Sequence, residues 1–222
     1  MTKPEHVPFT SYREHSPEET LRRAVAFREQ MQRRRSVREF SGRAVAREVI
    51  EQCVRAAGSG PNGANRQPWH FVAVGDPSLK QRIRTAAERG EYEFYHGPAN
   101  DEWLAALSPL GTDHHKPFLE TAPWLIAVFA QKHGVAPDGD KVPHYFVRES
   151  VGIAVGILIT AVHHAGLVAL PYTPSRAGSL NDLLGRPDHE RPVLILVVGY
   201  PAENALVPDI NRKPLAEIAT FL

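Results

Sequence analysis

The strongest chemical pattern in the sequence is a run of basic side chains around one hydroxyl, Arg34-Arg35-Ser36-Val37-Arg38. A guanidinium presents paired N–H donors that match two phosphate oxygens, and a serine hydroxyl adds a further donor. The run follows directly on a predicted helix, and cations favour the carboxyl end of a helix whether or not a ligand binds there. The residues alone therefore leave two interpretations open, a phosphate site or a solvated basic helix terminus.

A glycine-rich segment, Gly58-Ser59-Gly60-Pro61-Asn62-Gly63, matches the spacing G-x-G-x-x-G of dinucleotide-binding loops. That function requires a strand before the loop and a helix after it, so that the pyrophosphate meets a helix N-terminus. Here a predicted helix precedes the loop and a predicted strand follows it, so we reject the dinucleotide interpretation. A tight loop whose backbone approaches a ligand stays open, because glycines remove side-chain bulk.

The histidines are poorly spaced for a metal site. The pairs His114-His115 and His163-His164 are adjacent, so the two rings of each pair point in different directions on a helix. Cys53 is the single cysteine, which excludes an intrachain disulfide and a thiolate metal cluster. The sequence contains no H-E-x-x-H or G-x-S-x-G motif. We therefore expect no metal and do not favour hydrolysis.

Hydrophobic periodicity places these patterns on alternating helices and strands, which predicts a three-layer α/β domain. Ser16 and Pro17 provide an N-cap and a first-turn proline, and Glu19 completes a capping box. The run 144–165 is apolar almost all round, so this helix must be buried on more than one side. We predict helices from 17 into the basic run and at 46–57, 77–90 and 144–165, strands at 70–74, 124–130, 167–171 and 192–200, and a mobile excursion at 91–121.

Composition excludes several classes of function. Among 222 residues, 26 basic and 25 acidic side chains give a formal charge of +1, which argues against a nucleic-acid partner. Hydrophobic residues at 42% are too frequent for a disordered chain. The first twenty residues contain no apolar run, and His163 and His164 interrupt the apolar run 151–170. We expect a cytoplasmic protein that does not enter a membrane.

Three motifs in order, RRSVREF (34–40), GPNGANRQPWHFVAV (60–74) and NRKPL (211–215), resemble the FMN-dependent nitroreductase superfamily over about residues 20–222. The resemblance implies an α+β fold, a nitroreductase-like three-layer α-β-α domain with a mixed central sheet, formed as an intertwined homodimer with FMN at the interface. A single FMN-binding domain would span 1–222, with 1–15 as an N-terminal extension. The cofactor-binding residues implied by the resemblance are Arg34, Arg35, Ser36, Val37, Arg38, Asn62, Pro171, Tyr172, Thr173 and Arg212.

Further motifs narrow the resemblance to the soluble bacterial members of the iodotyrosine deiodinase branch. They include EYEFY (91–95), GTDHHKPFLETAP (111–123), HYFVRESVGIAVG (144–156) and Thr173-Pro174-Ser175. The resemblance places a substrate-binding triad at Glu91, Tyr95 and Lys116, a substrate-facing backbone N–H at Ala64, and the catalytic hydroxyl of Thr173 at flavin N5. Without that context, Glu91, Tyr95 and Lys116 would be read as a solvated face.

The triad has a chemical logic of its own. The zwitterion of an amino acid needs an anion for its ammonium and a cation for its carboxylate. Glu91 and Tyr95 are four residues apart and share one helix face, while Lys116 lies at the far end of the excursion. Residues 91–121 would therefore form an active-site lid that closes on the ligand and excludes water.

The expected function is FMN-dependent reductive dehalogenation of halogenated tyrosines by one-electron flavin chemistry. Electrons would come from a reductase or from NAD(P)H, with NADPH as the expected donor. Two alternatives stay open. One is a general NAD(P)H-dependent nitroreductase or enone reductase, and the other is a non-catalytic sensor that binds halotyrosine or flavin.

Overall fold

A computed structural model describes residues 5–97, 101–175 and 178–222. Parts of the predicted N-terminal extension and lid, at 1–4 and 98–100, lie outside the described residues. The chain divides into two compact units, the first ending at Arg34 and the second running from Arg35 to Leu222.

The first unit contains one helix, α1 (Pro17–Gln32). Its start confirms the predicted cap, because the Ser16 Oγ accepts a hydrogen bond from the Glu19 N–H at 3.3 Å. None of its residues is buried, and the apolar side chains of Leu21 and Phe27 are 66% and 55% exposed. The helix therefore presents apolar surface that is exposed among the described residues.

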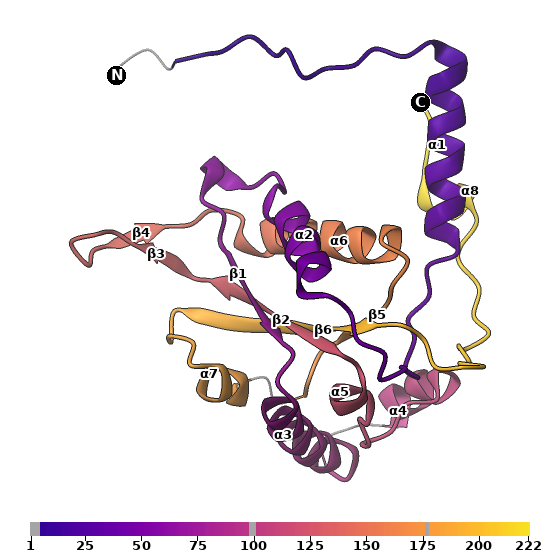
Figure 1. The fold of residues 1–222 in the computed structure, drawn as a ribbon, viewed down its shortest axis with the longest axis vertical. Helices are drawn as coiled ribbons and strands as arrows, with labels where there is room; N and C mark the ends of the chain where they lie inside the picture. The colour runs from indigo at the N-terminus through magenta and orange to yellow at the C-terminus, as the bar shows by residue number, and fades with distance from the viewer. Residues whose placement is uncertain (1–4, 98–100, 176–177) are drawn as a thin grey trace. The chain divides into compact units, whose positions relative to one another are not determined.

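The second unit is built on a four-stranded sheet in the order β1-β2-β6-β5 (Figure 1). All three neighbouring pairs are antiparallel. The expected mixed sheet is corrected to this extent: among the described residues, the parallel component is a single bridge between Ser36 and Ala169. The strands are β1 (Trp69–Val74), β2 (Trp124–Gln131), β5 (Val168–Tyr172) and β6 (Glu190–Gly199).

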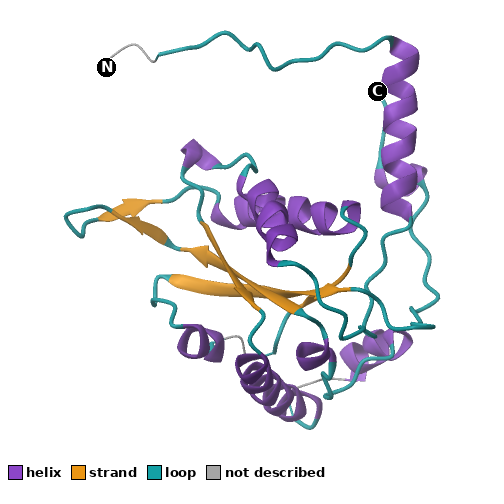
Figure 2. Ribbon diagram, viewed as in Figure 1, coloured by secondary structure: helices purple, strands orange, loops and turns teal. Residues whose placement is uncertain are grey.

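Helices cover both faces of the sheet, which confirms the three-layer arrangement (Figure 2). One face carries α2 (Arg47–Gly58) and α6 (Val147–His164), and the other carries α3 (Pro77–Tyr95), α5 (Phe118–Thr121) and α7 (Ser179–Leu184). Strand alternation explains the two cores, because successive side chains of β2 and β6 point to opposite faces. Ile126 and Leu196 pack under α2 and α6, whereas Leu125 and Ile195 pack against the other layer.

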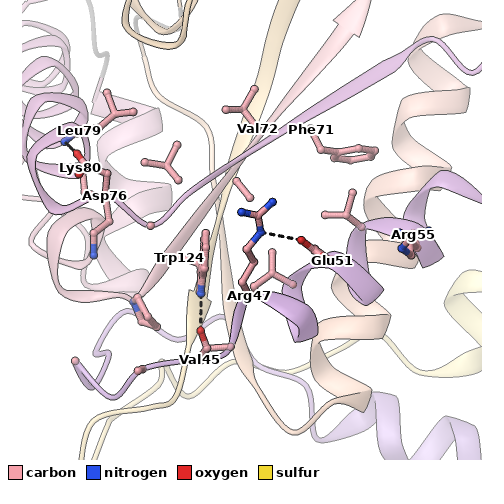
Figure 3. Close-up of a pocket in the computed structure, with 18 residues that line it drawn as sticks. Val45, Arg47, Glu51, Arg55, Phe71, Val72, Asp76, Leu79, Lys80 and Trp124 are labelled. Carbon is pink, nitrogen blue, oxygen red and sulfur yellow. Dashed lines mark hydrogen bonds and ion pairs between the residues drawn. The ribbon is translucent and has the colours of Figure 1, made fainter.

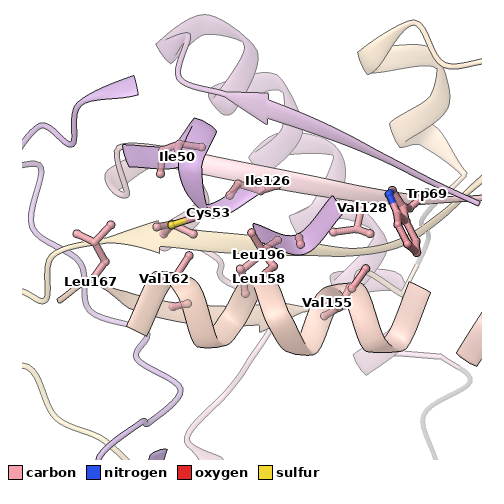
Figure 4. Close-up of a cluster of buried hydrophobic side chains, with 14 of the residues drawn as sticks. Ile50, Cys53, Trp69, Ile126, Val128, Val155, Leu158, Val162, Leu167 and Leu196 are labelled. Carbon is pink, nitrogen blue, oxygen red and sulfur yellow. The ribbon is translucent and has the colours of Figure 1, made fainter. Parts of the chain in front are cut away.

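The helix α6 is only half covered by its own chain. Its inner face contributes Val155, Leu158 and Val162 to a cluster with the sheet, as Figure 4 shows. Its outer face exposes Gly152 and Gly156, together with Ile153 at 43%. The predicted second wall for this apolar helix is therefore not supplied by the described part of this chain.

Much of the segment that was expected to be a mobile excursion, 91–121, forms helices. The helix α3 runs to Tyr95, past the predicted end near residue 90. It is followed by α4 (Asp101–Leu107) and the 3₁₀ turn η2 (Ser108–Leu110). These two elements were not predicted from the sequence, and neither were α5, α7, the turn α8 (Leu215–Ile218), or the hairpin of β3 (His133–Val135) and β4 (Lys141–Pro143).

Candidate active site

The part of the basic motif that belongs to the second unit, residues 35–38, pairs with β5, the strand that ends at Tyr172. The Val37 N–H donates to the Ala169 carbonyl at 3.3 Å, next to the parallel bridge at Ser36. This pairing aligns the motif with β5 over the residues that lead to Pro171 and Tyr172. Two predicted cofactor segments, far apart in the sequence, are therefore neighbours in the second unit.

The outer members of the basic motif make other contacts. The Arg35 guanidinium donates to the carbonyl of Pro208, which ties the segment after β6 to the motif. Arg34 ends the first unit, where its backbone N–H donates to the Met31 carbonyl at 3.2 Å. Arg212 lies beyond Pro208 on the exposed stretch before α8.

A cavity of about 450 Å³ opens where β5 ends, between α3 and the segment before α5. It brings together Glu91, Tyr95, Lys116 and Thr173. The other described lining residues come from the basic motif, α3, α4, the segment around α5, β5 and the turn after β5, and most of them are apolar. These are Arg38, Phe94, Trp103, Leu107, Thr112, Phe118, Leu170, Pro171, Tyr172, Pro174 and Ser175.

A buried ion pair lies in this cavity. The Glu91 Oε2 is 3.6 Å from the Lys116 Nζ, and the two residues are only 7% and 2% exposed. Lys116 Nζ also donates to Thr112 Oγ1 at 3.1 Å and to the Asp113 carbonyl. Burial holds the pKa of the Lys116 ammonium below its ordinary value, although the Glu91 carboxylate opposes this shift.

The second oxygen of Glu91 is held by the turn after β5. Its Oε1 accepts hydrogen bonds from the Tyr172 hydroxyl at 3.0 Å and from the Ser175 N–H and Oγ at 3.1 and 3.0 Å. Burial raises the pKa of the Tyr172 phenol, so this group is a donor throughout the physiological range. The sequence analysis assigned no role to Ser175, because a serine after a strand is typical of any turn.

Tyr95 and Glu88 hold the segment before α5 against α3. The Tyr95 hydroxyl donates to the Thr112 carbonyl at 3.2 Å, and burial raises the pKa of this phenol. The Glu88 Oε1 accepts from the Lys116 N–H at 2.8 Å and from Arg84 Nε at 2.9 Å. Glu88 was missed, although its spacing of four from Arg84 is a recognisable helical ion-pair signal.

The glycine-rich loop lies elsewhere and is strained. Ala64, Asn65 and Gln67 have φ values of 50°, 53° and 49°, a region that residues with a Cβ rarely adopt. The Gly63 N–H donates to Ser150 Oγ on α6 at 3.4 Å, and a Cβ on Gly63 would approach the Tyr145 carbonyl oxygen within 2.6 Å. The Asn62 Oδ1 accepts from the Gln67 N–H at 2.7 Å. Neither Asn62 nor Ala64 is among the described residues that line the cavity at β5.

The residues present fit one side of FMN. A phosphate needs cations and donors, which the Arg35–Arg38 segment supplies, and a planar ring needs apolar walls with a hydroxyl donor, which Leu170 and Thr173 supply at the cavity. Burial lowers the pKa of Arg38, and a bound anion would offset this cost of placing its charge in the cavity. The donor set is consistent with the flavin, and the predicted loop residues Asn62 and Ala64 are not part of the described lining of this cavity.

A larger groove of about 1050 Å³ lies beside β1, the strand at one edge of the sheet (Figure 3). It is lined from α2, β1 and the start of α3, and Figure 3 shows the Arg47–Glu51 pair, 2.7 Å between Nε and Oε1, within it. The Trp124 Nε1 donates to the Val45 carbonyl at 2.9 Å in its wall. The predicted catalytic and substrate residues are not among its described lining.

The described residues contain no group of three or more His, Cys, Asp or Glu side chains arranged to hold a metal ion. Among the same residues, no helix combines the length and apolar character needed to cross a membrane.

Comparison with known proteins gives a consistent result. The model of the nitroreductase family matches residues 31–200. An iodotyrosine deiodinase of Haliscomenobacter hydrossis is 51% identical over 216 residues, covering 97% of both chains. Human iodotyrosine deiodinase 1 is 44% identical over 96% of this chain and 74% of its own. A crystal structure of oxidized iodotyrosine deiodinase bound to FMN and 3-iodo-L-tyrosine superposes with a TM-score of 0.74 at 32% identity, covering 88% of this chain and 100% of that chain.

The shifted pKa of Lys116 gives a first testable prediction. Because the Glu91 carboxylate raises the pKa of Lys116 against the effect of burial, the Glu91→Gln variant should lower that pKa further. A pH titration of the lysine ¹³Cε shifts by NMR measures it, with Lys116→Arg identifying the signal. Glu102→Gln, an exposed carboxylate on α4, is the matched control and should leave the titration in place. An unchanged or raised midpoint in Glu91→Gln would show that the pair does not form.

Proposed function

The chain belongs to the nitroreductase family and, within it, to the iodotyrosine deiodinase branch, and from this premise we propose that it reductively dehalogenates halogenated tyrosines with FMN. Two electrons and a proton replace the carbon–halogen bond by a carbon–hydrogen bond, releasing halide and tyrosine. FMN, when bound, supplies the electrons. The observation that carries the proposal is the buried Glu91–Lys116 pair in the cavity that also contains Thr173.

The pair is suited to bind the zwitterion of an amino acid. The Glu91 carboxylate would accept the substrate ammonium, and the Lys116 ammonium would bind the substrate carboxylate. Each ion of the protein then exchanges a buried partner for another of the same charge, so neither is left unpaired in the cavity. Tyr95 would hold the segment around Thr112 over the bound substrate. Residues 91–121 act in this proposal as the active-site lid.

The cofactor assignments follow the basic motif and the end of β5. Arg35, Ser36 and Arg38 would hold the FMN phosphate and ribityl chain, with Val37 supplying backbone. The hydroxyl of Thr173 would donate to flavin N5 and favour one-electron steps. Pro171 and Tyr172 would border the ring, and in this role Tyr172 would act through its backbone, because its hydroxyl donates to Glu91.

A second copy of the chain would complete the site. The Ala64 N–H and Asn62 lie away from the cavity, on the loop against α6, so we propose that they reach the flavin and substrate of a partner. The outer face of α6, with Ile153, is apolar and uncovered by the described residues. In the described part of the chain β1 pairs only with β2 and leaves its outer edge open beside the large groove. An intertwined homodimer, in which 1–222 form one FMN-binding domain and Arg34 and Arg212 add phosphate contacts, uses all of these surfaces.

The electron donor is NAD(P)H or a reductase, and the reaction takes place in the cytoplasm in this proposal.

Anaerobic incubation of the reduced, FMN-bound protein with 3-iodotyrosine tests the activity, with iodide and tyrosine quantified. We expect both products in equal amounts. Faster turnover of nitroaromatics than of 3-iodotyrosine would favour a general nitroreductase. Tight binding without iodide release would indicate a sensor.

Thr173 provides a prediction that does not depend on turnover. We expect the parent protein to take up electrons in two one-electron phases during stepwise anaerobic reduction, and Thr173→Ala in a single two-electron phase, because the N5 donor is lost. Absorbance spectra during the titration distinguish the two patterns, and Thr173→Ser should restore the parent pattern. Identical spectra for all three proteins would remove Thr173 from the catalytic assignment.

The homodimer predicts a specific sensitivity of α6. Light scattering of the FMN-bound protein should give a dimer, and Ile153→Glu should shift it toward monomer with loss of FMN, because a charge would be buried at the interface. Val135→Glu on β3, a position that is 56% exposed, is the control and should stay dimeric. A parent protein that retains FMN as a monomer would contradict the proposal.

A further inference from the structure

The Glu91 carboxylate is held asymmetrically. Three donors converge on Oε1 at 3.0–3.1 Å, one from Tyr172 and two from Ser175. The ion pair to Lys116, at 3.6 Å, involves Oε2 instead. A carboxylate oxygen offers about two lone-pair sites. Oε1 is therefore fully used by the protein, and Oε2 is the oxygen that can exchange partners.

Two of the three donors on Oε1 have little conformational freedom. Tyr172 is 8% exposed, and its ring packs edge-on against Phe118 with centroids 5.7 Å apart. One of the Ser175 donors is a backbone N–H, which has no side-chain freedom to lose. Glu91 is thus presented in one orientation by groups that pay little further entropy on binding. The turn after β5 therefore helps to determine where the other oxygen, Oε2, points.

Fixing the carboxylate matters most for a ligand with an ammonium group. A charged hydrogen bond is strong only when donor and acceptor are aligned, and a buried carboxylate that can rotate loses that alignment. A ligand that lacks the ammonium does not use Oε2, so its affinity does not depend on the orientation of Glu91. The groups that position Glu91 therefore affect the affinity of ligands that carry an ammonium group, and not that of ligands that lack one.

We propose that Tyr172 and Ser175 are positioning residues that set the specificity of this site for ammonium-bearing halophenols, by clamping Glu91 through Oε1 and leaving Oε2 for the ligand. The proposal rests on the proposed function and deepens it. It assigns Tyr172 a role through its side chain, separate from any contact of its backbone with FMN. Because Tyr172 adjoins Thr173, the same turn serves both substrate recognition and the flavin.

The test uses ligands that divide the zwitterion. Fluorescence quenching of the oxidised, FMN-bound protein measures dissociation constants for 3-iodotyrosine, for 3-iodotyramine, which has only the ammonium, and for 3-(4-hydroxy-3-iodophenyl)propionate, which has only the carboxylate. In Tyr172→Phe we expect about tenfold weaker binding of the first two ligands, the size of one charged hydrogen bond, and less than threefold for the propionate. Ser175→Ala, which retains its backbone donor, should show the same selectivity with a smaller loss.

Tyr12→Phe is the matched control. It removes the same hydroxyl at a position that is 67% exposed and outside the described lining of the cavity, and should change none of the constants. Equal losses for all three ligands in Tyr172→Phe would indicate a general structural role and overturn the proposal, as would no loss for any. Ser175→Ala decides the matter if Tyr172→Phe does not retain FMN. If the parent protein binds 3-iodotyrosine but releases no iodide, the proposed activity fails while the positioning role is still measured. A parent that binds none of the ligands would contradict both.

Discussion

Two opposite charges buried in one cavity impose the main constraint on this molecule. Moving a carboxylate and an ammonium out of water costs several kcal/mol for each ion, and their attraction offsets this only when further hydrogen bonds complete both. Glu91, on α3, meets that condition through donors from the end of β5 and the turn after it, and the Lys116 ammonium meets it through Thr112 and Asp113, which precede α5. The ion pair is stabilised only where these elements meet, so it constrains how they are positioned around the cavity.

The sheet is what allows the elements to meet. Antiparallel β2 and β6 carry apolar side chains on both faces, so helices must cover both, and α3 is held against one face by Ile83 and Leu125. The end of β5 then faces the last turn of α3, where Glu91 lies. Ser36 and Val37 pair beside β5, which brings the basic motif to the same corner. The site is therefore assembled at the rim of a rigid core, where a binding constellation is held more accurately than on loops alone.

The same architecture supports the proposal that a second copy completes the site. The apolar outer face of α6, the exposed α1 and the open edge of β1 are surfaces that a stable monomer does not usually leave in water. The backbone at Ala64 and Asn65 is strained, and neither residue contributes to the described lining of the cavity. A partner that covers α6 and accepts this loop at its own site would account for the uncovered helix face and for the strained loop. These two observations are the physical basis for proposing the intertwined homodimer.

Local pattern in the sequence determined much of the fold. Ser16 and Pro17 located the start of α1, the apolar run at 124–130 located β2, and the apolar run within 144–165 located α6. It did not locate the hairpin β3–β4 or the short helices α4, α5 and α7, because three to seven residues are too few to establish a period. The end of α3 was placed too early, since the mixed residues 91–95 carry a weak helical period.

The candidate site divides in the same way. The side-chain chemistry of Arg35, Ser36 and Arg38 suggested a phosphate site but left a solvated helix terminus open, and Glu91, Tyr95 and Lys116 were predicted from the resemblance to a known branch. The structure brings the three predicted substrate residues to one cavity, and their roles stay predictions. Only the tertiary structure joined Glu91 to Tyr172 and Ser175, across more than eighty residues of chain, because a hydrogen bond between distant segments leaves no periodic trace in either. Periodicity records which side of an element is buried, whereas the partner it meets there depends on how the whole chain returns across the sheet.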